Sequence, residues 1–200
     1  GFYLKNPAEI LYFWKGGLAS HGAAIALLLT LFVYHKVKKI SLLQICDCFS
    51  FPAAVGATAV RIGNFFNSEI VGRVTEVPWA VKFPRYAAIM RRAQALPRHP
   101  SQLYEVALGL IVLLVLYLAN RYYKESRPTG LLGALFLITY FSGRFFVEYF
   151  KEYQTLQSSS PLTMGQYLSI PFVLAGFLLL IYSLTTYKKA SLDRTVKTKQ

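Results

Sequence analysis

The sequence predicts an all-α membrane protein, a polytopic bundle of about five transmembrane helices with a polar segment between the second and third spans. Of the 200 residues, 54% are hydrophobic and 16% are charged, whereas soluble chains average about 45–50% and about 25%. The chain also has 15 Phe and 14 Tyr, a content of aromatic residues that excludes a disordered protein. Two Cys residues are too few for a fold stapled by disulfides.

The spans follow from runs of sequence that carry few or no charges, since a transmembrane helix needs about 20 mostly apolar residues. The second run is the weakest because Asp47 and Pro52 interrupt it. Beyond the last run, residues 188–200 form a basic tail. The predicted spans are residues 18–35, 41–60, 103–120, 130–150 and 166–186.

The basic residues predict the orientation of the chain in the membrane. There are 22 Lys and Arg against 9 Asp and Glu; such an excess can indicate nucleic-acid binding, but a nucleic-acid module would not be this apolar. Residues 36–39, 121–127 and 188–199 are basic and fall on one side of the predicted bundle. Because cytoplasmic loops collect Lys and Arg, we expect the carboxyl terminus to be cytoplasmic and the chain to begin outside.

The segment at residues 61–102 breaks this charge rule. It falls on the outer side, yet it holds seven basic residues and only two acidic ones, Glu69 and Glu76. A long loop can tolerate such charge, because the rule is statistical. The alternative is that the arginines of this extracytoplasmic segment hold an anionic ligand.

The densest polar stretch of the chain runs from Arg61 to Arg73. Arg61, Asn64 and Asn67 are spaced three apart, so a helix would place them along one face, and Glu69 and Arg73 could pair at a spacing of four. A guanidinium grips a phosphate through two parallel hydrogen bonds, so the stretch predicts an anion site; ordinary interfacial ion pairs are the alternative. The ligand-binding candidates here are Asn64, Asn67, Glu69, Gly72 and Arg73.

Two histidines are candidates for accepting a proton, because a neutral imidazole does so near neutral pH. His21 opens the first span, and a His within a span is a functional candidate. His99 precedes the third span, between Arg98 and Pro100. For both residues the alternative is a well-built helix start, with Ser101 as a plausible N-cap in the second case.

The fourth span carries Tyr140, Arg144 and Glu148 at successive spacings of four, which places them on one helix face. An arginine at the centre of a span costs about 2.5–3.5 kcal/mol on insertion scales, and Arg144 lies nearer the outer end, where the cost is lower. Arg144 and Glu148 therefore predict either a ligand site or an intramembrane ion pair that fixes helix packing.

The sequence has no motif for metal or nucleotide chemistry. Asp47 lies between Cys46 and Cys48, but no His or further Cys stands at ligand spacing. A P-loop, a zinc motif and a nucleophile elbow are also missing from the sequence. No metal site is therefore predicted.

Together these stretches resemble the prolipoprotein diacylglyceryl transferase family of bacterial inner-membrane enzymes. Two positions depart from the family pattern, which usually has Gly where Val60 and Ala23 stand. Members have about seven spans, so the resemblance implies two further spans before residue 1. The matching stretches, in the family's order, are Ser20-His21-Gly22, Arg61 to Gly72, Arg98 to Glu105, Tyr140 with Arg144 and Glu148, and Met164-Gly165-Gln166 with Ser169-Ile170-Pro171.

The resemblance implies a reaction, its partners and a location. A diacylglyceryl group would pass from phosphatidylglycerol to the lipobox cysteine thiol of a prolipoprotein, which gives a thioether and glycerol-1-phosphate. Residues 1–187 would form one transmembrane catalytic domain in the bacterial inner membrane, with residues 188–200 as a cytoplasmic tail. The implied partners are phosphatidylglycerol, the prolipoprotein signal peptide and membrane lipid, without a metal, a nucleotide cofactor or nucleic acid.

The resemblance also implies roles for the candidate residues. His21 is the first choice for the base that favours the thiolate, and His99 is the second. Arg61 and Arg144 would neutralise the phosphate as the carbon–oxygen bond breaks. Glu148 would hold Arg144. The residues expected to bind substrate are Asn64, Asn67, Glu69, Gly72, Arg73, Tyr140 and Glu148.

Two other functions remain open. A small transporter or channel could use the same arginines to pass anions, but it would need polar residues through the full depth of several spans, and here they cluster toward the outer half. A non-catalytic scaffold, or an inactive fragment of the transferase, is the second alternative.

Overall fold

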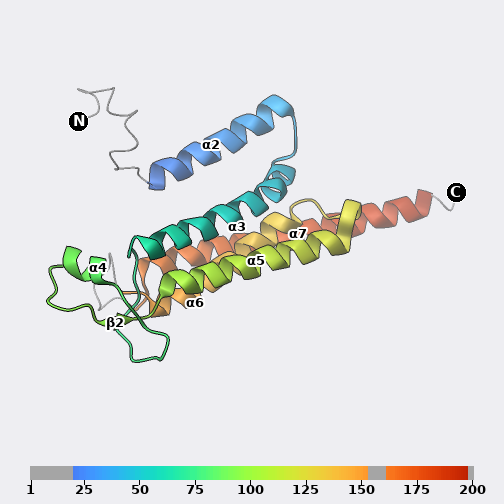
Figure 1. Cartoon of the computed structure of the whole chain (residues 1–200). Helices are drawn as coiled ribbons and strands as arrows, with labels where there is room; N and C mark the ends of the chain where they lie inside the picture. Colours follow the sequence, from blue (N-terminus) through green and yellow to red (C-terminus); the bar gives the residue numbers. More distant parts are fainter. Residues whose placement is uncertain (1–19, 153–160, 198–200) are drawn as a thin grey trace, which may run out of the picture. The chain divides into compact units, whose positions relative to one another are not determined.

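The computed structural model describes residues 20–152 and 161–197. The chain divides into two compact units, residues 1–45 and residues 46–200. Helices make up most of both described parts (Figure 1). The prediction of an all-α protein is confirmed; among the described residues, one short two-stranded sheet is the exception.

The first unit contains α2 (Ser20–Lys38). At its end Lys39 adopts a left-handed backbone conformation with φ of 54°, and His35 Nδ1 lies 2.6 Å from the carbonyl oxygen of Ile40. These features end the helix among its lysines. The helix occupies the place of the predicted span 18–35, whose first two residues lie outside the described part of the chain.

The second unit is built on four long helices, which run side by side in Figure 1. Within the described residues, four stretches are long and apolar enough to cross a membrane, against the five spans that the sequence predicted. They make this a multi-pass membrane protein. The four stretches are Leu42–Phe66, Ser101–Tyr123, Leu131–Phe150 and Met164–Lys189.

The bounds of the helices differ from those of the predicted spans. α3 (Leu42–Phe66) runs past the predicted end at residue 60, while α5 (Ser101–Tyr123) matches its span within three residues at each end. α6 (Leu131–Val147) is followed by a 3₁₀ turn, η4 (Glu148–Phe150). α7 (Met164–Lys197) continues through most of the predicted tail, because no Gly or Pro follows Gly176 to end it.

Small and apolar side chains bring α3, α5 and α6 together. Gly109 of α5 lies against Thr58 of α3, where an added Cβ would be 2.0 Å from the Thr58 hydroxyl oxygen. Small residues at such crossings let transmembrane helices approach closely. The middle of the bundle is thereby filled with packed side chains, and its buried core residues are Ala54, Val112, Leu116 and Leu132.

Asp47 explains why a charge is tolerated within α3. Its carboxylate is buried and accepts hydrogen bonds from the backbone N–H groups of Gly130 at 2.8 Å and Gly133 at 2.9 Å. These groups open α6, and the first N–H groups of a helix have no partner within the helix. A carboxylate there satisfies them and also interacts favourably with the helix dipole. Asp47 is thus a cap for α6, supplied by a neighbouring helix.

The polar segment between α3 and α5 forms a small substructure, for which the sequence predicted no detail over residues 74–97. β1 (Val81–Lys82) pairs antiparallel with β2 (Pro97–Arg98). The short helix α4 (Pro84–Ile89) lies between the two strands in sequence and begins with Pro, which suits a first helical turn. Figure 1 shows α4 and β2 together at one end of the four-helix bundle.

Candidate active site

Polar side chains from three helices meet at the end of the bundle that carries this substructure. Arg61 and Asn64 lie in the last two turns of α3, Glu105 lies near the start of α5, and Arg144 lies in the last turn of α6. Because α3 and α6 end where α5 begins, residues far apart in the sequence become neighbours. Their contacts with one another determine what the site can do chemically.

Glu105 is the centre of this site. Its side chain is only 3% exposed, and its two carboxylate oxygens form ion pairs with three cationic side chains. Arg61 Nε lies 2.7 Å from Oε2, Lys151 Nζ lies 2.9 Å from Oε1, and Arg144 Nη1 lies 3.4 Å from Oε1. Glu105 thereby holds both predicted arginines toward one point. We call Arg61, Glu105, Arg144, Glu148 and Lys151 the Glu105 cluster.

Glu148 has a different partner from the one expected. Its carboxylate pairs with Lys151, at 3.2 Å from Oε2 to Nζ, whereas Arg144 is held by Glu105. The expected contact between Glu148 and Arg144 is therefore replaced by one between Glu148 and Lys151. Since η4 tightens the chain after Val147, Glu148 is turned toward α7, where an added Cβ on Gly165 would lie 2.5 Å from its carboxyl carbon.

The Glu105 cluster has an excess of positive charge. Three cationic side chains face two carboxylates, which leaves one net positive charge. Lys151 and Glu105 are almost fully buried, but the side chain of Arg144 is 25% exposed and that of Arg61 is 13% exposed. A positive charge in a poorly hydrated place attracts an anion strongly. The cluster is thus suited to one singly charged anion that approaches the two arginines.

The polar network continues from Arg61 toward the loop that follows α3. Arg61 Nη1 donates to Asn64 Oδ1 at 3.1 Å, and Asn64 Nδ2 donates to Glu69 Oε2 at 2.8 Å. Three of the predicted residues are therefore brought together. Asn67 lies just past the end of α3 and is exposed, because the helix ends at Phe66.

α3 ends at Phe66, so Glu69 and Arg73 do not share the helix face on which a spacing of four could have paired them. Arg73 Nε donates to the carbonyl oxygen of Lys151 at 2.9 Å. Gly72 lies beside it where three backbone segments cross: an added Cβ would be 2.4 Å from His99 O and 2.7 Å from Phe150 O. Gly72 and Arg73 thus join the loop after α3 to the chain after α6; their predicted contact with substrate stays a prediction.

His99 lies in an aromatic surrounding rather than in the Glu105 cluster. Its Nδ1 is 3.0 Å from the hydroxyl oxygen of Tyr104, and its ring packs edge-on against Phe150. Trp79 Nε1 donates to the same hydroxyl at 2.7 Å. These contacts fix the orientation of the imidazole ring.

The other two predicted residues are His21 and Tyr140. His21 lies in the first turn of α2, and its side chain is outside the described residues. Tyr140 stacks on Phe136 with a centroid distance of 5.4 Å and lies one helical turn before Arg144. The structure therefore places Tyr140 between the apolar core and the Glu105 cluster.

A second carboxylate at this end of the bundle is Glu152. Arg98, which is 2% exposed, places Nη1 at 2.7 Å from Glu152 Oε2 and at 2.8 Å from the carbonyl oxygen of Gly72. Tyr86 donates its hydroxyl to Glu152 at 2.5 Å, and Arg92 Nη2 lies 3.3 Å away. We call Tyr86, Arg92, Arg98 and Glu152 the Glu152 cluster.

The Glu152 cluster shifts the pKa values of two of its members in opposite directions. Burial favours the neutral carboxyl group of Glu152, but the hydrogen bond from Tyr86 and the charges of Arg98 and Arg92 outweigh it, so the pKa of Glu152 lies below its ordinary value. Burial and the bond to Glu152 raise the pKa of Tyr86. The ionised carboxylate is thus the stable form.

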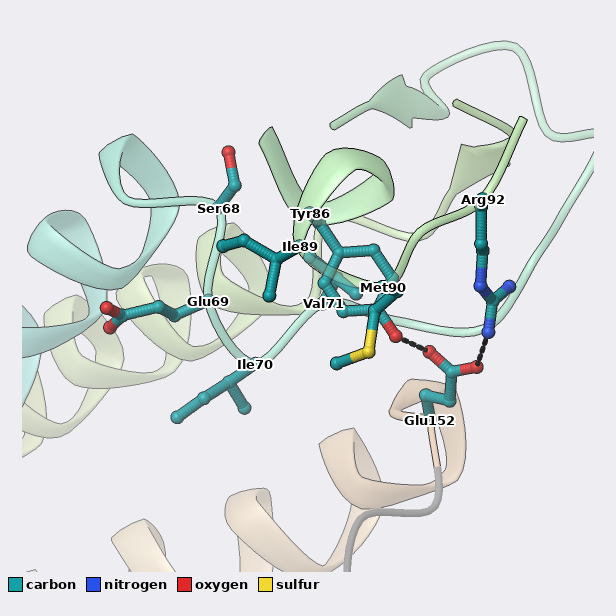
Figure 2. Close-up of a pocket in the computed structure, with 9 residues that line it drawn as sticks. All are labelled: Ser68, Glu69, Ile70, Val71, Tyr86, Ile89, Met90, Arg92 and Glu152. Carbon is teal, nitrogen blue, oxygen red and sulfur yellow. Dashed lines mark hydrogen bonds and ion pairs between the residues drawn. The ribbon is translucent and has the colours of Figure 1, made fainter. Parts of the chain in front are cut away.

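A cavity of about 600 Å³ lies between the loop after α3 and α4. Figure 2 shows Glu69 and Glu152 at opposite sides of it, with Ile89 and Met90 between them. Glu69 also belongs to the network that leads to Arg61. The lining residues are Ser68, Glu69, Ile70, Val71, Tyr86, Ile89, Met90, Arg92 and Glu152.

Two central residues of the site escaped the sequence reasoning. Glu105 was considered only as part of a helix start, and Lys151 was not considered. A signal for both was present: Glu105 is the one acidic residue in the sequence of α5, and Arg144, Glu148 and Lys151 are spaced four and three apart, as on one helix face. For metals, the described residues contain no group of three or more His, Cys, Asp or Glu side chains that could hold an ion.

Comparison with known proteins gives a family for this arrangement. The sequence model of the family described as prolipoprotein diacylglyceryl transferase matches residues 1–182. A relative from Tolumonas auensis is 41% identical over 186 residues, which cover 91% of this chain and 68% of the relative. A relative from Chloroherpeton thalassium is 40% identical, with 97% of this chain and 69% of the relative covered.

A third relative, from Bordetella parapertussis, is 40% identical over 88% of this chain and 64% of its own length. All three relatives carry the name phosphatidylglycerol–prolipoprotein diacylglyceryl transferase. The chain thus spans about two thirds of the length of the curated relatives that it matches.

Proposed function

The chain belongs to the prolipoprotein diacylglyceryl transferase family, a family of transferases, and from that premise we propose the reaction that its site carries out. It transfers the diacylglyceryl group of phosphatidylglycerol to the lipobox cysteine thiol of a prolipoprotein. The observation that carries this proposal is the Glu105 cluster, in which one buried carboxylate directs two arginines to the same point.

The charge of the cluster fits the phosphate of phosphatidylglycerol. A phosphodiester carries one negative charge, and the cluster carries one net positive charge. Arginine matches phosphate oxygens with parallel hydrogen bonds, which lysine cannot do. We therefore assign Arg61 and Arg144 to the phosphate, with Lys151 and Glu148 as the buried pair that keeps Glu105 in place.

The reaction places the new charge beside these arginines. The cysteine sulfur attacks the glycerol carbon that carries the phosphate, a carbon–sulfur bond forms, and the carbon–oxygen bond breaks. The electron pair of that bond stays on the phosphate oxygen, so glycerol-1-phosphate leaves with more negative charge than the lipid had. Guanidinium groups that are already in position stabilise this developing charge.

The thiol proton must go to a base, since the thiolate is the nucleophile. His21 and His99 both stay candidates for this role. When Nδ1 of His99 donates to Tyr104, its Nε2 is the nitrogen that can accept a proton. Asn64 and Glu69 extend the site toward the glycerol head group through their hydrogen-bonded chain.

The acyl chains have an apolar place on the bundle surface near Arg144. A groove of about 190 Å³ between α6 and α7 is lined mainly by apolar side chains. A lipid could thus reach the arginines sideways from the bilayer. The lining residues are Ser142, Phe145, Phe146, Ile170, Val173 and Leu174.

The bundle offers less support for an anion transporter. The charged side chains of the Glu105 cluster and the Glu152 cluster gather at the end where α3 finishes and α5 begins, while Ala54, Val112, Leu116 and Leu132 form an apolar core in the middle. A conduction path needs polar or hydrated residues through the depth of the membrane.

Insertion in the bacterial inner membrane with a cytoplasmic carboxyl terminus is part of the proposal.

A transferase assay tests the proposal directly. The full-length protein in proteoliposomes that contain phosphatidylglycerol receives a lipobox peptide, and mass spectrometry detects the diacylglyceryl thioether and glycerol-1-phosphate. Arg61→Gln is expected to abolish the product, while Arg121→Gln serves as the control, because Arg121 is exposed in the last turn of α5. If the full-length protein forms no thioether, the enzyme is not this transferase, and the inactive alternative holds.

A further inference from the structure

The cavity between the loop after α3 and α4 has no role in the reaction as described above. Its volume of about 600 Å³ falls within the range of about 300–1,000 Å³ that is usual for ligand pockets. A few residues of extended peptide would fit such a space.

The cavity lies outside the membrane-crossing part of the protein. Its lining from Ser68 to Arg92 falls between the candidate spans Leu42–Phe66 and Ser101–Tyr123, and Glu152 follows the candidate span Leu131–Phe150. An acyl chain has no reason to leave the bilayer for this place, since burial among apolar tails is its favoured state. The occupant is therefore a molecule that extends away from the membrane.

The cavity is linked to the Glu105 cluster through one side chain. Glu69 lines the cavity and accepts a hydrogen bond from Asn64, which in turn accepts one from Arg61. A molecule that reacts at the arginines and continues past Glu69 would enter the cavity. This continuity points to a substrate of the same reaction rather than to an unrelated ligand.

The lining has the mixed chemistry of a peptide-binding site. Ile89 is 64% exposed and Met90 is 51% exposed, although they lie outside the spans, and exposed apolar side chains grouped in one place mark an interaction site. Glu152 on the far side is ionised and held by Arg98 and Tyr86. Apolar side chains together with a few fixed polar groups are typical of pockets that bind by shape and orientation.

One wall of the cavity is held in shape before any ligand binds. Ile70 has a φ of 54°, a left-handed conformation that costs a β-branched residue free energy. Two buried side chains of α5 hold it there: Ser101 Oγ donates to Ile70 O at 3.0 Å, and Gln102 Nε2 donates to Glu69 O at 2.7 Å. A preformed wall lowers the entropic cost of binding.

We propose that this cavity binds the stretch of the prolipoprotein that follows its acceptor cysteine. The inference rests on the proposed function and extends it to the second substrate. With the cysteine sulfur at the Glu105 cluster, the hydrophobic part of the signal peptide stays in the bilayer, and the residues after the cysteine leave it past Glu69. The cavity would therefore favour peptides that continue beyond the cysteine.

Two synthetic lipobox peptides test this, one that ends at the cysteine and one that continues several residues past it. KM for each is measured with the full-length protein in phosphatidylglycerol proteoliposomes. We expect the wild-type protein to favour the longer peptide, and Met90→Trp, which fills the cavity, to reduce that preference about tenfold, the effect of about 1.4 kcal/mol of lost binding. Ile89→Trp is a second filling variant, and Leu96→Trp is the matched control on an exposed residue outside the lining.

The outcomes separate this inference from the proposed function. Equal KM values for the two peptides in the wild-type protein, or an unchanged preference in both filling variants, would overturn it. A rise in KM for phosphatidylglycerol instead would assign the cavity to the lipid head group. If the wild-type protein transfers nothing, the proposed function fails. Fluorescence anisotropy then measures whether a labelled long peptide, with serine in place of the cysteine, binds the protein. Binding that Met90→Trp removes would still support the cavity as the peptide site, and an absence of binding would overturn the inference.

Discussion

Two carboxylates at the same end of the bundle are each surrounded by cations, yet they differ in what they leave open. In the Glu152 cluster, Arg98 is buried, bonded to Glu152 and to a backbone carbonyl, and stacked on Tyr86 at 4.9 Å. In the Glu105 cluster, three cations converge on one carboxylate, and Arg144 is a quarter exposed. The first arrangement completes the hydrogen bonds of an arginine inside the protein, and the second leaves part of Arg61 and Arg144 exposed, where we propose that the phosphate binds.

An arginine in a motif is therefore not itself a sign of a ligand site. Arg61 and Arg98 both belong to stretches that resemble the family pattern, but Arg98 ties the chain after α6 to the loop after α3. Neighbouring protein groups complete the hydrogen bonds of Arg98, whereas we propose that a ligand completes those of Arg61.

The largest expected effect is the loss of stability in Glu105→Gln. Removing this charge leaves Arg61, Arg144 and Lys151 with Glu148 as their one carboxylate, and breaking a buried ion pair costs about 3–5 kcal/mol. This loss of stability is measured as the change in the free energy of unfolding in detergent micelles. Glu152→Gln is the comparison and should cost less, because Glu152 is more exposed. Equal losses in the two variants would contradict the distinction.

The next effect is on catalysis, in Arg144→Lys. A lysine keeps the charge but cannot present parallel hydrogen bonds, so kcat should fall by about 10²–10³ while the protein still inserts and folds. Initial rates at saturating phosphatidylglycerol measure the change, with Arg121→Lys as the control. Wild-type turnover in Arg144→Lys would show that Arg144 does not bind the phosphate.

Arg98→Lys should show the reverse behaviour. A lysine ammonium lacks the planar fork that serves Glu152 and Gly72 together, so we expect the loss of one of these hydrogen bonds, worth about 1.5–3 kcal/mol when a charged group takes part. The melting temperature should therefore fall, while kcat at temperatures well below melting stays near that of the wild type. A drop in kcat as large as that of Arg144→Lys, without a drop in melting temperature, would place Arg98 in the catalytic site.

The smallest effect is a pH dependence of stability through Glu152. Because its pKa is lower in the folded protein than its ordinary value of about 4.3, its ionised form stabilises the protein above that value, and the stabilisation is lost as pH falls through the folded pKa. The difference in melting temperature between wild type and Glu152→Gln should thus shrink from about pH 5 downward. A difference that grows toward acid would show that the pKa is raised instead.

Much of the site could be predicted from the sequence, but its contacts could not. Arg61, Asn64 and Glu69 were expected to act together and do lie in one hydrogen-bonded chain. The expected Arg144–Glu148 contact is replaced by Arg144–Glu105, because the chain tightens into a 3₁₀ turn after Val147 and changes the face on which Glu148 lies. Helical spacing predicts partners only while the helix continues.

Asp47 gives the same lesson at the other end of the bundle. In the sequence it weakened the second span, yet its carboxylate caps α6 across a helix interface. Nothing near residue 47 in the sequence indicates residues 130 and 133 as its partners. The partner of a buried charge is set by how helices lie against one another.

Residue types and hydrophobic lengths were enough to predict that the chain is helical and crosses a membrane, the approximate positions of its helices, and the residues that carry the family's pattern, because these are local properties of the chain. The tertiary structure was needed to place Glu105 and Lys151 at the centre of the site, to show that Arg98 bonds to Glu152 and Gly72, and to show the cavity beside Glu69. Those facts depend on contacts between residues far apart in the sequence, such as Glu105 with Lys151 at 46 positions and Arg98 with Glu152 at 54 positions, and a buried charge is stable only where such contacts satisfy it.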